Sequence, residues 1–396
     1  MLGCIYRIRR LRRCRLQASL QQLSSRGSRV RKKEETSGEF GGTNLSAIEA
    51  APIPTAMSEK SIPTATEPAF DLLVIGAGPT GLACAIEAQK RGFRAGLVDK
   101  GCICNSIYHY PSHMTFFTTS ELLEIGDIPF PSTNAKPSRN EALEYYRLVA
   151  AHYKLDVRQY HFVERVTGTD GDFVLHLVDR FERRSQLHAR KLAIATGYYD
   201  LPNIMGIPGE NLSKVQHYYD DPHPYFATDV VVIGGKNSAA IAALELWRHG
   251  ARVTLVHRGP EMHRHVKYWI KPDIENRIKH GEINAFFRSR VVEIAPDTVH
   301  LETPEGPVTL KNDFVFALTG YRPDFDFLEA LGVSCQGTDR LPVCNHETLE
   351  SNVPGIYLAG VIVAGSRTNE IFIENGRFHG RQIAEALARQ PGEANQ

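Results

Sequence analysis

The residues of this chain whose types and spacing best suit chemistry are three glycines and an aspartate. Gly76, Gly78 and Gly81 form a G-x-G-x-x-G motif between an apolar run and an alanine-rich stretch. In such a motif the first glycine permits a tight turn, the second lets a diphosphate approach the backbone, and the third lets helix and strand pack closely. Asp99 ends a second apolar run 23 residues after Gly76, where a carboxylate can accept hydrogen bonds from ribose hydroxyls. We therefore expect an adenine dinucleotide with a free ribose, held by Gly76, Gly78, Pro79, Thr80, Gly81, Asp99 and Lys100.

A second motif of this kind is degenerate but keeps the same register. Gly234 and Gly235 follow an apolar run, and Lys236 occupies the place of the middle glycine. His257, followed by Arg258, lies 23 residues after Gly234, where the first motif has its carboxylate. A carboxylate repels a 2′-phosphate whereas a His-Arg pair can neutralise one, so this site is predicted to prefer NADP(H). The expected binding residues are Gly234, Gly235, Asn237, Ser238, Ala239, His257 and Arg258, with Lys267 as a further candidate. The alternative for Arg258 is an ordinary solvated charge.

The elements that must position these residues repeat in the same order. Each motif lies between an apolar strand and a helix, leads to a second strand, and is followed later by an apolar strand that ends in Thr-Gly, at Gly197 and at Gly320. This repetition predicts an internal duplication and an α/β fold with two Rossmann-like domains. A last strand and turn are expected over 353–360 and a closing helix over 376–389. The segment from Ser138 to Glu141 predicts a capping box that opens a helix to about residue 153.

Length, charge and composition restrict the class of protein. With 396 residues, 42% of them hydrophobic, the chain can form two or three domains with a sizeable core, and no apolar run approaches the ~18 residues of a membrane span. Residues 1–33 hold 11 of the 46 Lys and Arg and no acid, so the rest is net negative and no nucleic-acid partner is expected. Residues 1–67 are predicted to be a disordered extension, basic and then of low complexity, with Met57 as an alternative start. We expect a cytoplasmic protein, although the basic segment also fits an organellar transit peptide.

Taken together, these motifs resemble the thioredoxin reductase type of flavoprotein, which has two dinucleotide-binding domains. The longer segments 106–111, 115–126, 266–276 and 369–380 resemble the YpdA family of bacillithiol disulfide reductases. The resemblance covers nearly all of 68–390. It implies an FAD domain formed by 68–222 and 319–390, an inserted NADPH domain over 223–318, and a tail over 391–396. It also implies that Gly197 belongs to the cofactor-binding residues and that Gly360 approaches the flavin and its ribityl chain.

Thiol chemistry is where the sequence departs from this resemblance. The seven cysteines include no C-x-x-C pair, and none lies in 218–222, where such a pair would precede the second motif. The YpdA-like reductases are associated with a cysteine in the first glycine loop, where this chain has Thr80, and a hydroxyl cannot replace a thiolate in disulfide exchange. Cys102 and Cys104 form a C-x-C whose disulfide would close a strained ring, so two ordinary thiols are favoured over a redox pair. We expect Cys84 to be buried and structural, we assign no catalytic side chain, and the histidine clusters form no recognised metal site.

The sequence thus predicts an FAD-containing, NADPH-dependent oxidoreductase in which hydride passes from nicotinamide to flavin and onward to an acceptor. The acceptor implied by the resemblance is a low-molecular-weight disulfide such as bacillithiol disulfide, or a small redox protein. One alternative is a ferredoxin- or flavodoxin-NADP reductase, which needs no cysteine. Another is a non-catalytic nucleotide-binding module. A flavin monooxygenase is disfavoured because its characteristic insertion is not visible, and we expect the chain to form a homo-oligomer.

Overall fold

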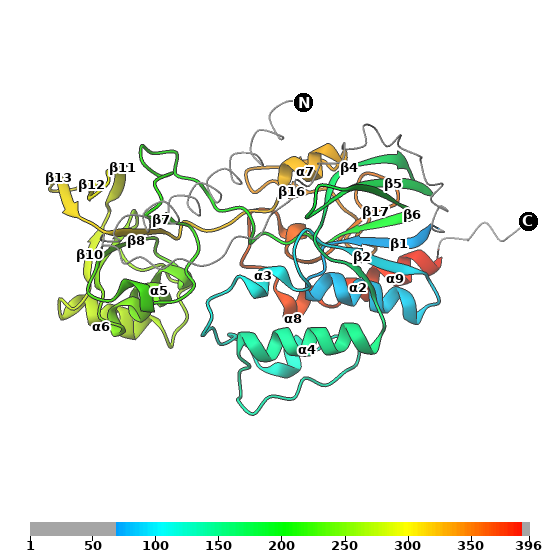
Figure 1. The fold of residues 1–396 in the computed structure, drawn as a ribbon, viewed down its shortest axis with the longest axis horizontal. Coiled ribbons are helices and arrows are strands. Elements are labelled where there is room, and N and C mark those ends of the chain that lie inside the picture. The colour runs from blue at the N-terminus through cyan, green and yellow to red at the C-terminus, as the bar shows by residue number, and fades with distance from the viewer. Residues whose placement is uncertain (1–68, 390–396) are drawn as a thin grey trace, which may run out of the picture. The chain divides into compact units, whose positions relative to one another are not determined.

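A computed structural model describes residues 69–389 of the chain. The expected extension over 1–67, its alternative start at Met57 and the tail over 391–396 lie outside these residues. The described part contains two α/β domains, the first discontinuous and the second inserted into it, so the predicted fold class is confirmed (Figure 1). No helix in this part is long and apolar enough to cross a membrane.

The first domain is built on a sheet with the strand order β3-β2-β1-β6-β5-β4, to which β17 is added by pairing with β6. Its strands are β1 (Phe70–Ile75), β2 (Ala95–Val98), β3 (Asp156–Arg158), β4 (His161–Thr169), β5 (Asp172–Asp179), β6 (Arg184–Ile194) and β17 (Ile356–Leu358). The pairs of β1 with β2 and β6, of β2 with β3 and of β6 with β17 are parallel, whereas β4, β5 and β6 form an antiparallel meander. The long strand β6 therefore takes part in both arrangements.

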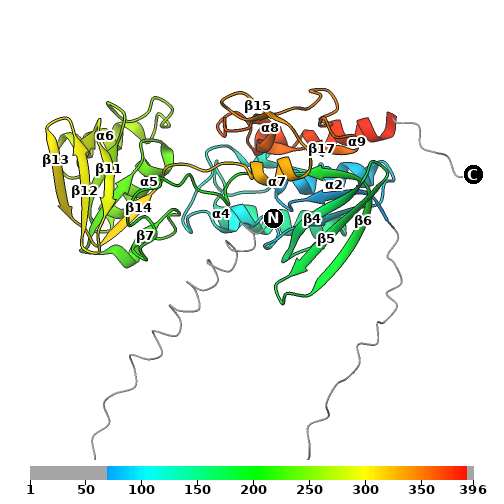
Figure 2. The same ribbon diagram turned by 90° about the horizontal axis from the view of Figure 1, so that it is seen from above.

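Helices cover one face of this sheet. They are α2 (Pro79–Lys90), α3 (Asn105–Tyr108), α4 (Arg139–His152), α8 (Ile373–Gly376) and α9 (His379–Arg389). Side chains alternate along β1, so Leu72 and Val74 join the core beneath α2 and α9, while Leu73 and Ile75 face the opposite core with α7 (Phe325–Ala330). Figures 1 and 2 both show α2 and α9 side by side, and this packing holds the first glycine loop at the carboxyl end of β1.

The second domain repeats this plan. Its parallel sheet has the order β10-β9-β8-β14-β7 and is followed by the antiparallel sheet β11-β12-β13. The strands are β7 (Val215–Gln216), β8 (Asp229–Ile233), β9 (Arg252–His257), β10 (Asn284–Phe287), β11 (Arg290–Ile294), β12 (Thr298–Thr303), β13 (Gly306–Lys311) and β14 (Phe314–Ala317), with helices α5 (Asn237–Arg248) and α6 (Lys271–Lys279). In both domains the strand before the glycine loop lies between the strand after the next helix and the strand that ends in Thr-Gly, as a duplication requires.

Two predicted boundaries differ from the structure. The sequence placed the start of the inserted domain at 223, but β7 pairs with β14 and already belongs to the second sheet. A two-residue strand carries too little hydrophobic pattern to be predicted. The closing helix was expected from Gly376, whereas Gly376 ends α8 and α9 begins at His379. The predicted capping box is confirmed, because Ser138 accepts a hydrogen bond from the Glu141 backbone and the Glu141 carboxylate accepts one from the Ser138 backbone.

The two connections between the domains pair with each other. Pro202 and Tyr321 form an antiparallel bridge, the Asn203 amide donates to the Gly320 carbonyl at 2.9 Å, and the Thr319 hydroxyl donates to the Asn203 carbonyl at 2.6 Å. The loops that follow the two Thr-Gly strands are thereby held together.

Candidate functional site

The first glycine loop has the geometry that its spacing predicts. Gly76 has φ +110°, and a Cβ there would lie 2.4 Å from the Ala195 carbonyl oxygen. A Cβ at Gly81 would lie 2.0 Å from the Gly76 carbonyl oxygen, so α2 can pack on β1 only without a side chain at that position. At Gly78, by contrast, a Cβ would meet no atom within 4 Å. The space beside Gly78 is therefore free of protein atoms, as a ligand that approaches the backbone requires.

Asp99 joins the end of β2 to this loop. One oxygen of its carboxylate accepts a hydrogen bond from the Ala77 amide at 2.8 Å and the other accepts one from Gly101 at 2.7 Å. Burial raises the pKa of Asp99, and the two backbone hydrogen bonds oppose that shift. Each oxygen retains a lone pair for a ribose hydroxyl. Lys100 forms an ion pair with Asp200 at 2.9 Å, so its charge is partly engaged.

The second glycine loop keeps the inner contacts of the first. Gly234 has φ +149°, and a Cβ there would lie 2.6 Å from the Leu318 carbonyl oxygen. Ala239, in the place of Gly81, is buried against this turn. Asn237 has a supporting role: its side-chain oxygen accepts from the Lys267 amide at 2.9 Å, and its nitrogen donates to the His265 carbonyl at 3.3 Å. Ser238 is exposed and lines the cavity.

His257 and Arg258 lie in different environments. A Cβ on Gly235 or on Gly259 would lie 2.4–2.5 Å from atoms of the His257 ring, which therefore fills the space between these two glycines. Burial, followed by the charges of Arg258 and the neighbouring His263, lowers the pKa of His257, so its imidazole is neutral at pH 7. Of the two residues predicted to pair with a 2′-phosphate, Arg258 is exposed and carries a permanent charge. His257 instead supports the glycine loop, as Asp99 does through Ala77.

The loop after β17 approaches the first glycine loop at Thr80. Gly360 has φ +78°, and Cβ atoms placed on Gly360 and Gly376 would lie 3.3 and 3.2 Å from the Thr80 hydroxyl oxygen. The Gly360 amide donates to His379 Nδ1 at 3.0 Å. Burial lowers the pKa of His379 to about 4, so the ring is a neutral acceptor at pH 7. His379 lies in segment 369–380, which carries the family resemblance, but no spacing in the sequence assigns it a role.

Five tyrosines that sequence reasoning missed form one wall of the site. The ring centroids of Tyr199 and Tyr321 are 4.5 Å apart, and Tyr110 and Tyr218 lie within 5.3 Å of one or the other; Tyr198 completes the group. The Tyr218 hydroxyl donates to the Tyr199 carbonyl, and the Tyr321 hydroxyl donates to the His217 carbonyl. Burial raises the pKa of every member, to about 12 for Tyr321, so all stay protonated. The available signal was the tyrosines that directly follow Gly197 and Gly320.

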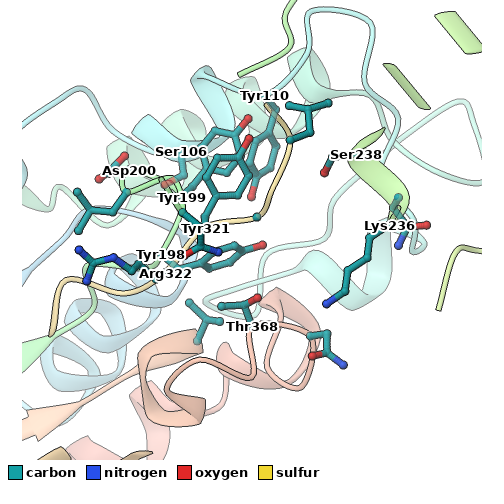
Figure 3. A pocket seen from close by; sticks show the side chains of 18 of the residues that line it. Ser106, Tyr110, Tyr198, Tyr199, Asp200, Lys236, Ser238, Tyr321, Arg322 and Thr368 are labelled. Carbon is teal, nitrogen blue, oxygen red and sulfur yellow. The ribbon is translucent and has the colours of Figure 1, made fainter. Parts of the chain in front are cut away.

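Both glycine loops line a single cavity of about 2000 Å³. This exceeds the roughly 300–1,000 Å³ of an ordinary small-molecule site, so there is room for two ligands. Figure 3 shows Tyr110, Tyr199 and Tyr321 gathered on one side of it, while Lys236 and Ser238 enter from the second glycine loop. Gly197, with φ +70°, and Gly360 also line this space.

The cysteines of the described part are free and poorly suited to act as nucleophiles. Cys84 is fully buried, as expected, and burial raises the pKa of its thiol to about 12. Burial also raises the pKa of Cys102 and, much further, that of Cys104. The same cause raises the pKa of Cys335 and of Cys344. Because the thiolate is the reactive form, these environments favour ordinary thiols over a redox pair.

Comparison with known proteins gives concordant matches. The family model described as pyridine nucleotide-disulphide oxidoreductase matches residues 73–360. The bacilliredoxin reductase Bdr of Bacillus subtilis (strain 168) is 48% identical over 321 residues, which cover 80% of this chain and 97% of that protein. The solved bacillithiol disulfide reductase Bdr (YpdA) of Bacillus cereus is 46% identical with a TM-score of 0.79, over 81% of this chain and 98% of that one. The solved Bdr (YpdA) of Staphylococcus aureus is 42% identical with a TM-score of 0.78, over 81% of this chain and 99% of that one.

Proposed function

The chain belongs to the pyridine nucleotide-disulphide oxidoreductases and, among them, to the Bdr (YpdA) family, and from this premise we propose that it uses NADPH to reduce a bacillithiol-type disulfide. It is an NAD(P)H-dependent flavoprotein oxidoreductase. The preference for NADPH, the residues that bind each cofactor and the identity of the acceptor belong to the proposal. The observation that carries it is a single cavity lined by two glycine loops of different charge, one beside Asp99 and the other beside Arg258.

FAD fits the first domain. The open space at Gly78 lies at the first turn of α2, where helix geometry leaves backbone N–H groups without partners inside the helix. A diphosphate there would accept from these groups, and Asp99 would accept from the adenosine ribose. Gly360, whose amide is held by His379, would border the flavin end. When bound, FAD and NADPH supply the two-electron transfer, and the chain contributes their orientation and the exclusion of water.

NADPH fits the second domain. Arg258 is exposed beside the glycine loop and can pair with a 2′-phosphate, because its guanidinium stays charged at every physiological pH. His257 supports this loop, because its ring fills the space between Gly235 and Gly259.

The tyrosine wall would cover one side of the cavity with apolar ring surface, because the hydroxyls of Tyr199, Tyr218 and Tyr321 already donate to backbone carbonyls. Their raised pKa values keep these hydroxyls protonated at pH 7, so they cannot act as bases.

A second candidate acceptor is ferredoxin or flavodoxin. The raised thiol pKa values of the described cysteines, together with Thr80 in the first glycine loop, favour it, since such a reductase needs no thiol. The acceptor that we favour is still a disulfide, because the relatives with 42–48% identity are named for bacillithiol disulfide or bacilliredoxin.

The experiment that tests the proposal is anaerobic reduction of the purified protein with NADPH, followed by mixing with candidate acceptors. We expect bleaching of the flavin at lower concentrations of NADPH than of NADH, and reoxidation by bacillithiol disulfide faster than by ferredoxin, flavodoxin, quinone or oxygen. Rapid reoxidation by ferredoxin without turnover of any disulfide would establish the second candidate instead. A protein that purifies without flavin and takes up none would contradict both.

A further inference from the structure

The two glycine loops differ at the position of the middle glycine. Gly78 is the N-cap of α2 with φ −76° and ψ 176°, and Lys236 is the N-cap of α5 with φ −108° and ψ −169°. Both backbones are extended, so neither position needs glycine for its conformation. At Gly78 the absence of a side chain therefore matters only because it keeps the space beside the backbone open. In the second loop a lysine side chain starts from the corresponding place.

The charge of Lys236 is free to serve a ligand. Its side chain is exposed, and Figure 3 shows it extending from the second glycine loop into the cavity. Within residues 69–389 it takes part in no ion pair, whereas Lys100 at the first site is paired with Asp200. Burial, followed by the positive charge of Lys236, lowers the pKa of the neighbouring His263. The fold therefore gains no ion pair from this lysine.

We propose that Lys236 binds the diphosphate of the nicotinamide cofactor, and that an ammonium–phosphate contact replaces the close backbone approach which Gly78 permits in the first domain. This inference rests on the proposed nicotinamide site in the second domain. The diphosphate is the expected target because it lies at the N-terminus of the helix after the glycine loop, whereas a 2′-phosphate lies at the end of the second strand, beside Arg258. Lys236 should thus serve NADPH and NADH alike, and Arg258 only NADPH.

The test is calorimetric binding of three ligands to the FAD-loaded protein: NADP⁺, NAD⁺ and adenosine 2′-monophosphate, which lacks the diphosphate. A hydrogen bond between charged groups contributes about 1.5 kcal/mol, which is about tenfold in Kd. Lys236→Ala should raise the Kd for NADP⁺ and for NAD⁺ by the same factor of about ten and leave the Kd for adenosine 2′-monophosphate unchanged. Arg258→Ala should raise the Kd for NADP⁺ and for adenosine 2′-monophosphate but not the Kd for NAD⁺. Lys279→Ala, at the exposed end of α6, controls for the loss of one positive charge.

The variant Lys236→Gly separates a lysine that binds from a lysine that is only tolerated. If the ammonium contributes affinity, this variant binds NADP⁺ more weakly than the wild type, although it recreates the glycine pattern of the first loop. Equal or tighter binding by Lys236→Gly would overturn the inference, as would a loss confined to the two ligands that carry a 2′-phosphate. Wild-type protein that binds neither NADP⁺ nor NAD⁺ would instead refute the proposed nicotinamide site itself.

Discussion

Two glycines of the first loop should separate the stability of the fold from the binding of its ligand. A Cβ at Gly81 would lie 2.0 Å from the Gly76 carbonyl oxygen, whereas a Cβ at Gly78 would meet nothing within 4 Å. Gly81→Ala is therefore predicted to destabilise the protein even without FAD. Gly78→Ala should leave the stability of the flavin-free protein unchanged and weaken the binding of FAD.

The magnitudes follow from these contacts. To restore an ordinary separation of about 3.4 Å, the start of α2 must move away from β1 by more than 1 Å, although the helix is buried along much of its length. Overpacking of this kind costs up to about 3 kcal/mol. At Gly78 the backbone suits alanine, and the small effects on helix capping and on the unfolded chain have opposite signs, so the change should stay within about 0.5 kcal/mol. The added methyl group would collide with the diphosphate of FAD. This should weaken FAD binding by roughly 1–3 kcal/mol, which raises the Kd about 5- to 150-fold.

The assay is urea unfolding of the flavin-free proteins, followed by circular dichroism, together with FAD titration by quenching of flavin fluorescence. Gly92→Ala is the control, because Gly92 has φ +84° with no neighbour near its Cβ and lies away from the cavity. It should cost about 1 kcal/mol in backbone strain and leave the Kd for FAD unchanged. Wild-type affinity in Gly78→Ala would show that no diphosphate occupies the space beside this residue. Undiminished stability in Gly81→Ala would refute the close packing of α2 on β1.

Three further variants test the remaining parts of the site and fold. Arg258→Ala should raise the KM for NADPH far more than that for NADH, and equal losses for the two would contradict a 2′-phosphate role. Ser138→Ala should lower the free energy of unfolding by about 1 kcal/mol through loss of the capping box, which urea titration measures. The folded pKa of His379, about 4, lies below its ordinary 6.5, so the unfolded chain binds more protons between these values and stability falls as pH drops through this window. His379→Gln should flatten that part of the stability profile relative to wild type, and an unchanged profile would count against the buried neutral ring.

The residues that could be predicted are those whose role follows from local spacing. The distances from Gly76 to Gly81 and to Asp99 are set by one turn, one helix and one strand, so a local sequence pattern reports the geometry directly. The same rule located Gly234 and His257, even though the second motif is degenerate.

Residues brought together over long sequence distances could not be predicted. The contacts within the tyrosine wall depend on how both domain connections pair, because the wall joins Tyr110, Tyr198, Tyr199, Tyr218 and Tyr321. The environment of His257 could not be predicted either, because burial of its ring between two glycines, followed by the charges of Arg258 and His263, lowers its pKa further. Local pattern identifies the residue type, whereas burial in the folded chain determines its protonation.

The duplication allows the two glycine loops to be compared within one chain, and the comparison separates packing from binding. Gly76 and Gly234 make the same contact, each against a carbonyl oxygen just after a central strand, Ala195 and Leu318. Where the loops face the cavity they differ: Gly78 corresponds to Lys236, and Asp99 to His257 with Arg258 beside it. Packing explains the first set of residues in both domains, but it does not explain why the second set changes from an open, acidic site to a basic one. The two proposed ligands would explain it, because they differ in phosphate chemistry: a dinucleotide with a free ribose in the first domain and one with a 2′-phosphate in the second.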